Sequence, residues 1–104
     1  MKILALEREL PGATSEGFQR HAKEEARQAW ELHQAGLIRE LYFRADQQTA
    51  VLVLECASVD DATSILARLP YVREGLIAFD LIPLKAYSGF LRLFAEVDAY
   101  GRDK

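Results

Sequence analysis

The sequence lacks most of the features by which small proteins are assigned to a function. Its 104 residues include one cysteine, Cys56, so the chain has no internal disulfide and no cysteine-based metal site. Cys56 lies in an apolar run, where we expect a buried, inert thiol. The sequence has no glycine-rich phosphate loop, nucleophile elbow or nucleotide-binding fingerprint. We therefore expect no nucleotide-dependent chemistry, no bound metal and no cofactor.

An excess of one charge and a long hydrophobic run are missing too. The 13 basic and 16 acidic residues give a net charge of -3, which provides no electrostatic footprint for nucleic acid or anionic membranes. No apolar run reaches the length of a membrane span, and "MKILALERE" is too short and too charged for a signal peptide. We expect a soluble cytoplasmic protein with neither nucleic acid nor membrane as a partner.

The pattern that is present predicts one compact domain with alternating strands and helices. Strand-like composition over residues 2–9 ends at Pro11-Gly12, and Thr14 or Ser15 is placed to cap a helix that runs to about residue 35. Gly36 is placed to end that helix. Residues 37–45 and 49–57 then favour a hairpin around "DQQ".

The second half of the chain repeats the alternation. Ser58 and Asp61 have the spacing of a capping box, so we expect a second helix that runs to about residue 69 and stops near Pro70. Residues 76–84 favour a fourth strand that ends at Pro83. The order βαββαβ predicts an α+β, ferredoxin-like fold with a four-stranded antiparallel sheet and both helices on one face.

The strands are apolar on both faces. A sheet covered by helices on one face alone is expected to be polar on its other face. In "AVLVLEC" the valines and the leucines fall on opposite faces, and "LIAFDLI" is similarly apolar. We therefore expect a homodimer that packs sheet to sheet, with higher assembly left open. The domain should span residues 1–95. It includes an apolar arm (85–95) that either docks on its own domain or a partner, or covers a pocket, and a polar tail (96–104) follows.

Glu25 is the most unusual residue of the first predicted helix. Spacings of 4, 3, 4 and 3 residues form one stripe, which contains Phe18, Ala22, Glu25, Ala29 and Leu32. Glu24 falls on the solvent face, whereas Glu25 lies among the small residues of the face that we expect to be buried. A buried carboxylate must be paired, hydrogen-bonded or protonated. Glu25 is therefore either half of an ordinary ion pair or a general acid or base in a small pocket.

Possible partners of Glu25 define the remaining candidate residues. His21 precedes it by one helical turn, and Arg39 or Tyr42 could stabilise a developing oxyanion. We predict Glu25, His21 and Arg39 as catalytic residues. The predicted substrate-binding residues are Phe18, Tyr42, Arg44 and Asp80. Asp80 interrupts an apolar strand, so it is also a candidate for a structural pair with an arginine.

Three segments together resemble the muconolactone δ-isomerase family of the dimeric α/β barrel group: "ELHQAGLIRELYF", "AVLVLE" and "ILARLPYVREGLIAFDLIPL". The resemblance covers about residues 2–84. It implies a ferredoxin-like protomer, a sheet-to-sheet dimer and a cofactor-free 1,3 proton shift on a small lactone. Glu25 and Arg39 match family positions. Asp80 stands where the family has glutamate, Glu40 stands where it has histidine, and "KAYSGF" replaces a His-Pro segment, so we expect a divergent member.

Three functions are compatible with these residues. The first is a small cofactor-independent enzyme that transfers a proton on a carbonyl or lactone compound, with Glu25 as the acid or base. The second is a non-catalytic module of the same fold that binds a small organic molecule or supports assembly. The third is a cofactor-free monooxygenase, or a haem-binding relative with His21 or His33 as the axial ligand.

Overall fold

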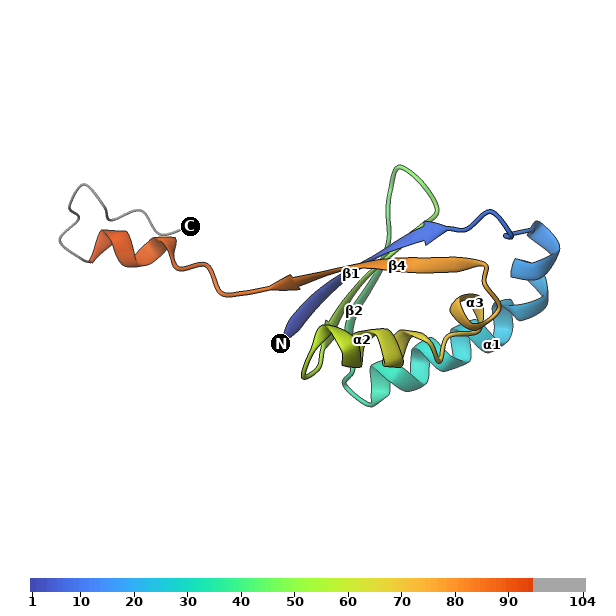
Figure 1. Ribbon diagram of the computed structural model, residues 1–104, viewed down its shortest axis with the longest axis horizontal. Helices are drawn as coiled ribbons and strands as arrows, with labels where there is room; N and C mark the ends of the chain where they lie inside the picture. The colour runs from blue at the N-terminus through green and yellow to red at the C-terminus, as the bar shows by residue number, and fades with distance from the viewer. Residues whose placement is uncertain (95–104) are drawn as a thin grey trace.

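A four-stranded antiparallel sheet with its helices on one face forms the body of the protein (Figure 1). This computed structural model describes residues 1–94. The sheet order is β2-β3-β1-β4, and the chain order is βαββαβ apart from two short helices. The elements are β1 (Lys2–Glu9), α1 (Ser15–Gln34), β2 (Ile38–Phe43), β3 (Ala50–Glu55), α2 (Val59–Leu66), α3 (Pro70–Arg73), β4 (Ile77–Leu84) and the 3-10 helix η1 (Gly89–Leu93). The predicted ferredoxin-like α+β fold is confirmed.

The ends of the two main helices follow the sequence signals. Thr14 Oγ1 accepts the Gly17 N–H at 3.0 Å at the start of α1, and Ser58 Oγ accepts the Asp61 N–H at 3.1 Å at the start of α2. Past the end of α1, Gly36 has a φ of 79°, the left-handed conformation that glycine adopts without steric cost. No helix within residues 1–94 is both long enough and apolar enough to cross a membrane.

Two expectations about prolines are wrong. The second helix stops at Leu66 and not near residue 69, and Pro70 begins the separate helix α3. Proline suits the first turn of a helix, because its N–H would have no partner there and its φ is already helical. The fourth strand ends at Leu84, the last residue of the predicted range, but Pro83 lies within β4 and does not end it. An edge strand tolerates proline, and β4 lies at the edge of the sheet.

The core lies between the sheet and the helices. In the register of the sheet, Ile3 faces Leu54 and Ala5 faces Leu52, and all four side chains are buried. Leu32 from α1 and residues of α2 cover them. Cys56, which we expected to be buried, is half-buried, and its Sγ donates to the Ser58 carbonyl at 3.4 Å. The apolar stripes of helix and sheet therefore meet as the pattern predicts.

The opposite side of the sheet, called here the outer face, is also apolar. Residues alternate along each strand, so this face carries Leu4, Leu6, Val51, Val53, Ile82 and Leu84. In Figure 1 the helices lie on the other side of the sheet. None of these six side chains is fully buried in the single chain, and Ile82 and Leu84 are 41% and 42% exposed.

The C-terminal arm leaves the domain instead of packing on it. Figure 1 shows residues 85–94 continuing beyond β4, with η1 well away from the sheet and helices. Its large apolar side chains are 65–85% exposed: Tyr87, Phe90, Leu91, Leu93 and Phe94. Docking on its own domain is therefore not observed, and the alternatives of a partner or a pocket stay predictions. The predicted polar tail, residues 96–104, lies outside the described residues.

Candidate functional site

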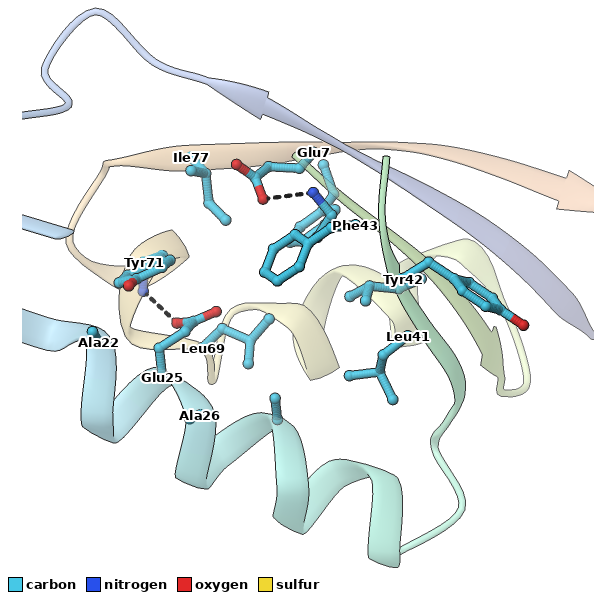
Figure 2. A pocket seen from close by; sticks show the side chains of 14 residues that line it. Glu7, Ala22, Glu25, Ala26, Leu41, Tyr42, Phe43, Leu69, Tyr71 and Ile77 are labelled. Atoms are coloured by element: carbon cyan, nitrogen blue, oxygen red, sulfur yellow. Dashed lines mark hydrogen bonds between the residues drawn. The ribbon is translucent and has the colours of Figure 1, made fainter. Parts of the chain in front are cut away.

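A pocket of about 320 Å³ separates the first helix from the sheet (Figure 2). Its walls come from α1, from the edge strand β2, and from β1, β3, α3 and β4. Most of the lining is apolar and includes Leu41, Phe43, Leu52 and Phe79. A mostly apolar cavity with a few convergent polar groups is the usual form of a small-molecule site.

Alanines of α1 create the space. Ala22, Ala26 and Ala29 line the pocket together with Glu25, and their short side chains leave the sheet uncovered opposite them. We expected this helical stripe to be buried, but Leu32 is the one fully buried residue of α1. Ala22 and Ala26 are exposed, because the pocket is open on one side. The stripe therefore faces a cavity in the single chain, not a filled core.

Glu25 lies in this pocket and is held by the backbone. Its Oε1 accepts the Tyr71 N–H at 2.9 Å, so Oε2 is the oxygen left to meet a ligand (Figure 2). Burial raises the pKa of the Glu25 carboxyl above its usual value of 4.5, and the negative charge of Glu7 acts in the same direction. The Tyr71 N–H and the positive charge of Arg73 oppose that rise in pKa.

Tyr71 is in position because α3 begins one residue earlier. Its hydroxyl donates to the Phe18 carbonyl at 3.1 Å, and the two rings pack edge to face with centroids 5.0 Å apart. These contacts attach α3 to α1 and keep the Tyr71 N–H aimed at Glu25. Phe18, a predicted substrate-binding residue, therefore supports the site through Tyr71, and it lines a neighbouring cavity.

Glu7 is a second carboxylate in the same pocket, and sequence reasoning did not select it. Figure 2 shows Glu7 on the sheet side and Glu25 on the helix side of the space between them. Glu7 Oε1 accepts the Ala50 N–H at 2.9 Å. Burial raises the pKa of Glu7, and the nearby charge of Glu9 adds to the rise, whereas the Ala50 N–H opposes it. The sequence feature that could have indicated Glu7 is its position on the same strand face as Ile3 and Ala5, which are buried.

A second cavity of about 540 Å³ adjoins the first and is more polar. Glu7, Phe43 and Tyr71 border both cavities. Gln47, Gln48 and Thr49 of the β2–β3 turn line the second one. Within residues 1–94, Thr49 Oγ1 is the one buried side-chain nitrogen or oxygen without a hydrogen-bond partner. The Glu7 end of the pocket therefore offers polar surroundings, whereas the Leu41 end is apolar.

The other predicted catalytic residues do not line the pocket. His21 is half-buried, and it is absent from the lining of either cavity. Arg39 is exposed, and its Nε donates to the Gly36 carbonyl at 2.6 Å. Within residues 1–94, no group of three or more histidine, cysteine, aspartate or glutamate side chains is arranged to hold a metal ion.

Of the remaining predicted substrate-binding residues, only Tyr42 borders the pocket. Its hydroxyl donates to Glu40 Oε1 at 2.8 Å and points away from the cavity (Figure 2). Arg44 forms an exposed pair with Asp46, with Nη2 and Oδ2 2.6 Å apart. Asp80 lies on the outer-face side of β4, where its Oδ1 is 3.3 Å from Arg8 Nε. Alternation along β2 and β4 separates these polar groups from Glu25.

Comparison with known proteins gives a fold and no family assignment. The chain matches no protein-family model, and no curated protein matches it. Among solved structures it is similar to 5-chloro-2-hydroxyhydroquinone dehydrochlorinase from Burkholderia phenoliruptrix, solved in complex with 2,5-dihydroxybenzoquinone. The TM-score is 0.59 at 19% sequence identity, and the match covers 86% of this chain and 98% of that one. The similarity supports the ferredoxin-like α+β fold.

Proposed function

We propose that the pocket is the active site of a small cofactor-independent enzyme that moves a proton on a carbonyl compound. The observation that carries this proposal is Glu25, a carboxylate with a raised pKa, fixed by the Tyr71 N–H in a mostly apolar cavity. A carboxylate held in this way is a stronger base than one in water and needs no reorganisation to act. The fold shared with a ring-dehalogenating enzyme adds general support.

The two glutamates suit opposite roles. Burial raises the pKa of both carboxyls. The charge of Glu7 adds to the rise in the pKa of Glu25 and Arg73 opposes it, whereas the charge of Glu9 adds to the rise in the pKa of Glu7. Two carboxyl groups that border one apolar pocket and repel each other when both are ionised can share one proton, so one acts as base and the other as acid. Glu25 Oε2 removes a proton from the carbon beside a carbonyl, and protonated Glu7 donates a hydrogen bond to the resulting enolate oxygen. Return of the proton from Glu25 to another carbon completes an isomerisation.

This arrangement changes the partners that we expected for Glu25. Glu7 takes the role of oxyanion donor that the sequence suggested for Arg39 or Tyr42, which are bonded to Gly36 and Glu40. A catalytic role for His21 stays a prediction without a supporting contact. A muconolactone isomerase-like reaction is the finer form of the proposal, and it rests on the resemblance of the sequence to that family.

We also propose that two copies of the chain pair through the outer face. That face presents six aliphatic side chains that the single chain leaves partly or largely exposed. Contiguous apolar surface of this kind on a soluble domain marks an interaction site. A second copy is the partner that a sheet of this shape fits by self-complementarity.

The proposal is tested by hydrogen exchange into a neutral ring ketone. We expect the protein to accelerate solvent-deuterium incorporation beside the carbonyl of 2-indanone, measured by NMR, relative to acetate at the same concentration. Glu25→Gln keeps an oxygen that accepts the Tyr71 N–H but removes the base. It should lower the rate by about 10²- to 10⁴-fold.

Glu24→Gln is the matched control, because Glu24 is the neighbouring residue and pairs with Arg27 at 3.7 Å, outside the pocket. This variant should retain the rate of the unmodified protein. Equal rates for Glu25→Gln and the unmodified protein would exclude Glu25 as the base. No acceleration by the folded, unmodified protein would favour the non-catalytic binding module.

A further inference from the structure

The charges around the pocket are of one sign. Among the described residues that line it, Glu7 and Glu25 carry the charged groups, and lysine, arginine and histidine are absent. The rest of the wall is apolar apart from Tyr42 and Tyr71. Tyr42 turns its hydroxyl to Glu40, and Tyr71 turns its hydroxyl to the Phe18 carbonyl. A ligand in this pocket therefore meets carboxyl groups and hydrocarbon.

Backbone donors at the pocket wall are already engaged. Protein sites for anions rely on N–H groups or cationic side chains that point at the ligand. Here the Tyr71 N–H points at Glu25 and the Ala50 N–H points at Glu7, each at 2.9 Å. The two donors that would otherwise attract an anion therefore bond to carboxylates of the protein itself.

Three arginines in or beside the elements around the pocket have partners outside it. Arg73, the cation whose charge acts on Glu25, has its Nε 3.5 Å from Glu74 Oε2. Arg44 pairs with Asp46, and Arg39 donates to the Gly36 carbonyl. None of the three belongs to the lining residues. A carboxylate ligand would therefore face one or two negative charges at short range, with no cationic side chain among the described residues of the lining.

The size of the cavity suits a ligand with one ring. A volume of about 320 Å³ is about twice that of the roughly 150 Å³ apolar cavity that holds one benzene molecule. One substituted ring fits this space. Its apolar edge would lie toward Leu41 and its polar substituent toward the Glu7 end, where the polar cavity with Thr49 adjoins.

We propose that the pocket selects an uncharged, single-ring compound with a hydroxyl or carbonyl substituent and rejects ring carboxylates. The inference deepens the proposed function and rests on it for the identity of the site. It separates this chain from any enzyme of similar fold that must hold a carboxylate substrate, because such an enzyme needs a cation or free N–H groups in the pocket.

A matched pair of probes tests this selectivity. 4-Hydroxybenzamide and 4-hydroxybenzoate have the same ring and hydroxyl group and nearly the same shape, but only the second carries a negative charge at about pH 7. Binding of each to the full chain is measured by calorimetric titration. We expect the amide to bind and the carboxylate to bind at least about tenfold more weakly, because a like charge lies nearby.

Variants connect the selectivity to the two carboxylates. Glu25→Gln should reduce the preference for the amide, and Glu7→Gln should reduce it less, because Glu7 is the protonated partner. The double variant should bring the two affinities within about threefold of each other. Glu24→Gln should keep the full preference. Binding of the carboxylate to the unmodified protein as tightly as the amide, or no binding of the amide, would overturn the inference.

The outcome is separable from that of the proposed function. If the amide binds selectively while 2-indanone shows no accelerated exchange, the selectivity stands and the catalytic proposal fails. If exchange is accelerated while the carboxylate probe binds at least as well as the amide, catalysis stands and the inferred substrate class is wrong. Titration reads binding directly, so neither result depends on turnover.

Discussion

Glu25 is held in its pocket by a backbone N–H and not by another side chain. We expected an ion pair, a hydroxyl or His21 to stabilise it, and none of these bonds to it in the described residues. A single amide hydrogen bond offsets part of the cost of burying the carboxylate, so the pKa of Glu25 stays raised. Because the Tyr71 N–H offsets the cost of burial only in part, the Glu25 carboxylate can still accept a proton. A carboxylate fully paired with a cation would be a weaker base.

The raised pKa of Glu25 makes stability depend on pH. The folded protein holds the Glu25 proton more tightly than the unfolded chain does. The contribution to the free energy of unfolding is therefore fully present below the usual pKa of 4.5 and is lost as pH rises through the raised, folded value. Glu25→Gln has no charge to bury, so its melting temperature should match that of the unmodified protein in acid and exceed it at neutral pH.

Thermal unfolding measured at a series of pH values checks this prediction, with Glu24→Gln as the control of equal composition. A variant that melts well below the unmodified protein at neutral pH would mean that the Glu25 charge stabilises the fold. Glu7→Gln should also have a higher melting temperature than the unmodified protein at neutral pH, because burial raises the pKa of Glu7 too.

At this scale the sequence selected Glu25 but neither Glu7 nor Tyr71. Helical spacing placed Glu25 on the inner stripe without knowledge of the fold. Glu7 shares a strand face with Ile3 and Ala5, but its entry into the pocket depends on the alanines of α1 opposite it. Tyr71 contributes through its backbone N–H, and a backbone contact leaves no trace in the type of side chain.

At the scale of elements, α3 is the short segment that completes the site. It has four residues, begins at Pro70, and connects to α1 through the ring and hydroxyl of Tyr71. The sequence predicted the strands, the caps and the end of α1, because each follows from local propensity. It did not predict α3, since a proline after a helix reads equally well as the end of one helix or the start of another.

Gly36 should be the residue that matters most for the turn that follows α1. Its φ of 79° places any side chain in an unfavourable conformation, although a Cβ there would make only an ordinary contact, 3.8 Å from Arg39 Nε. Gly36→Ala should therefore lower the free energy of unfolding by about 1–2 kcal/mol, measured by urea denaturation.

Gly12 provides the matched glycine for this experiment. Its φ is not positive, and a Cβ built there would lie 3.9 Å from the Gly75 carbonyl oxygen, an ordinary contact. Gly12→Ala should leave stability unchanged or raise it by up to about 1 kcal/mol. If both variants lost the same free energy of unfolding, the loss at Gly36 would not come from its backbone conformation.

At the scale of the whole molecule, the outer face and the C-terminal arm are the two apolar surfaces that the single chain leaves uncovered. Both present large apolar side chains to solvent in the single chain. They are continuous with each other, because the arm follows directly from β4, whose Ile82 and Leu84 belong to the outer face. The sequence predicted this apolar surface through strands that are apolar on both faces, but a single chain does not identify its partner.

A charge placed on the outer face should break the proposed pair. Val53 is central on that face, where it lies beside Leu4 of the neighbouring strand. Val53→Glu should convert a dimer at micromolar concentration into a monomer in a sedimentation experiment, because burial of an unpaired carboxylate opposes association.

Gln19→Glu adds the same charge on the exposed surface of α1 and should leave the dimer intact. A stable monomer of the unmodified chain at micromolar concentration would exclude pairing through the outer face. A Val53→Glu protein that remains dimeric would place the interface elsewhere, with the arm as the next surface to test.

The anchoring of both pocket carboxylates to peptide groups has a consequence for how such a site changes over time. The anchor of Glu7 does not depend on the side chain at position 50, since any residue except proline supplies the same N–H. The anchor of Glu25 is also a backbone N–H, but the ring and hydroxyl of Tyr71 hold it in place. The acidic pair can therefore persist while positions such as Leu41, Phe43 and Ala26 vary to admit different rings. The positions that shape the cavity are therefore separate from the peptide groups that hold its two carboxylates.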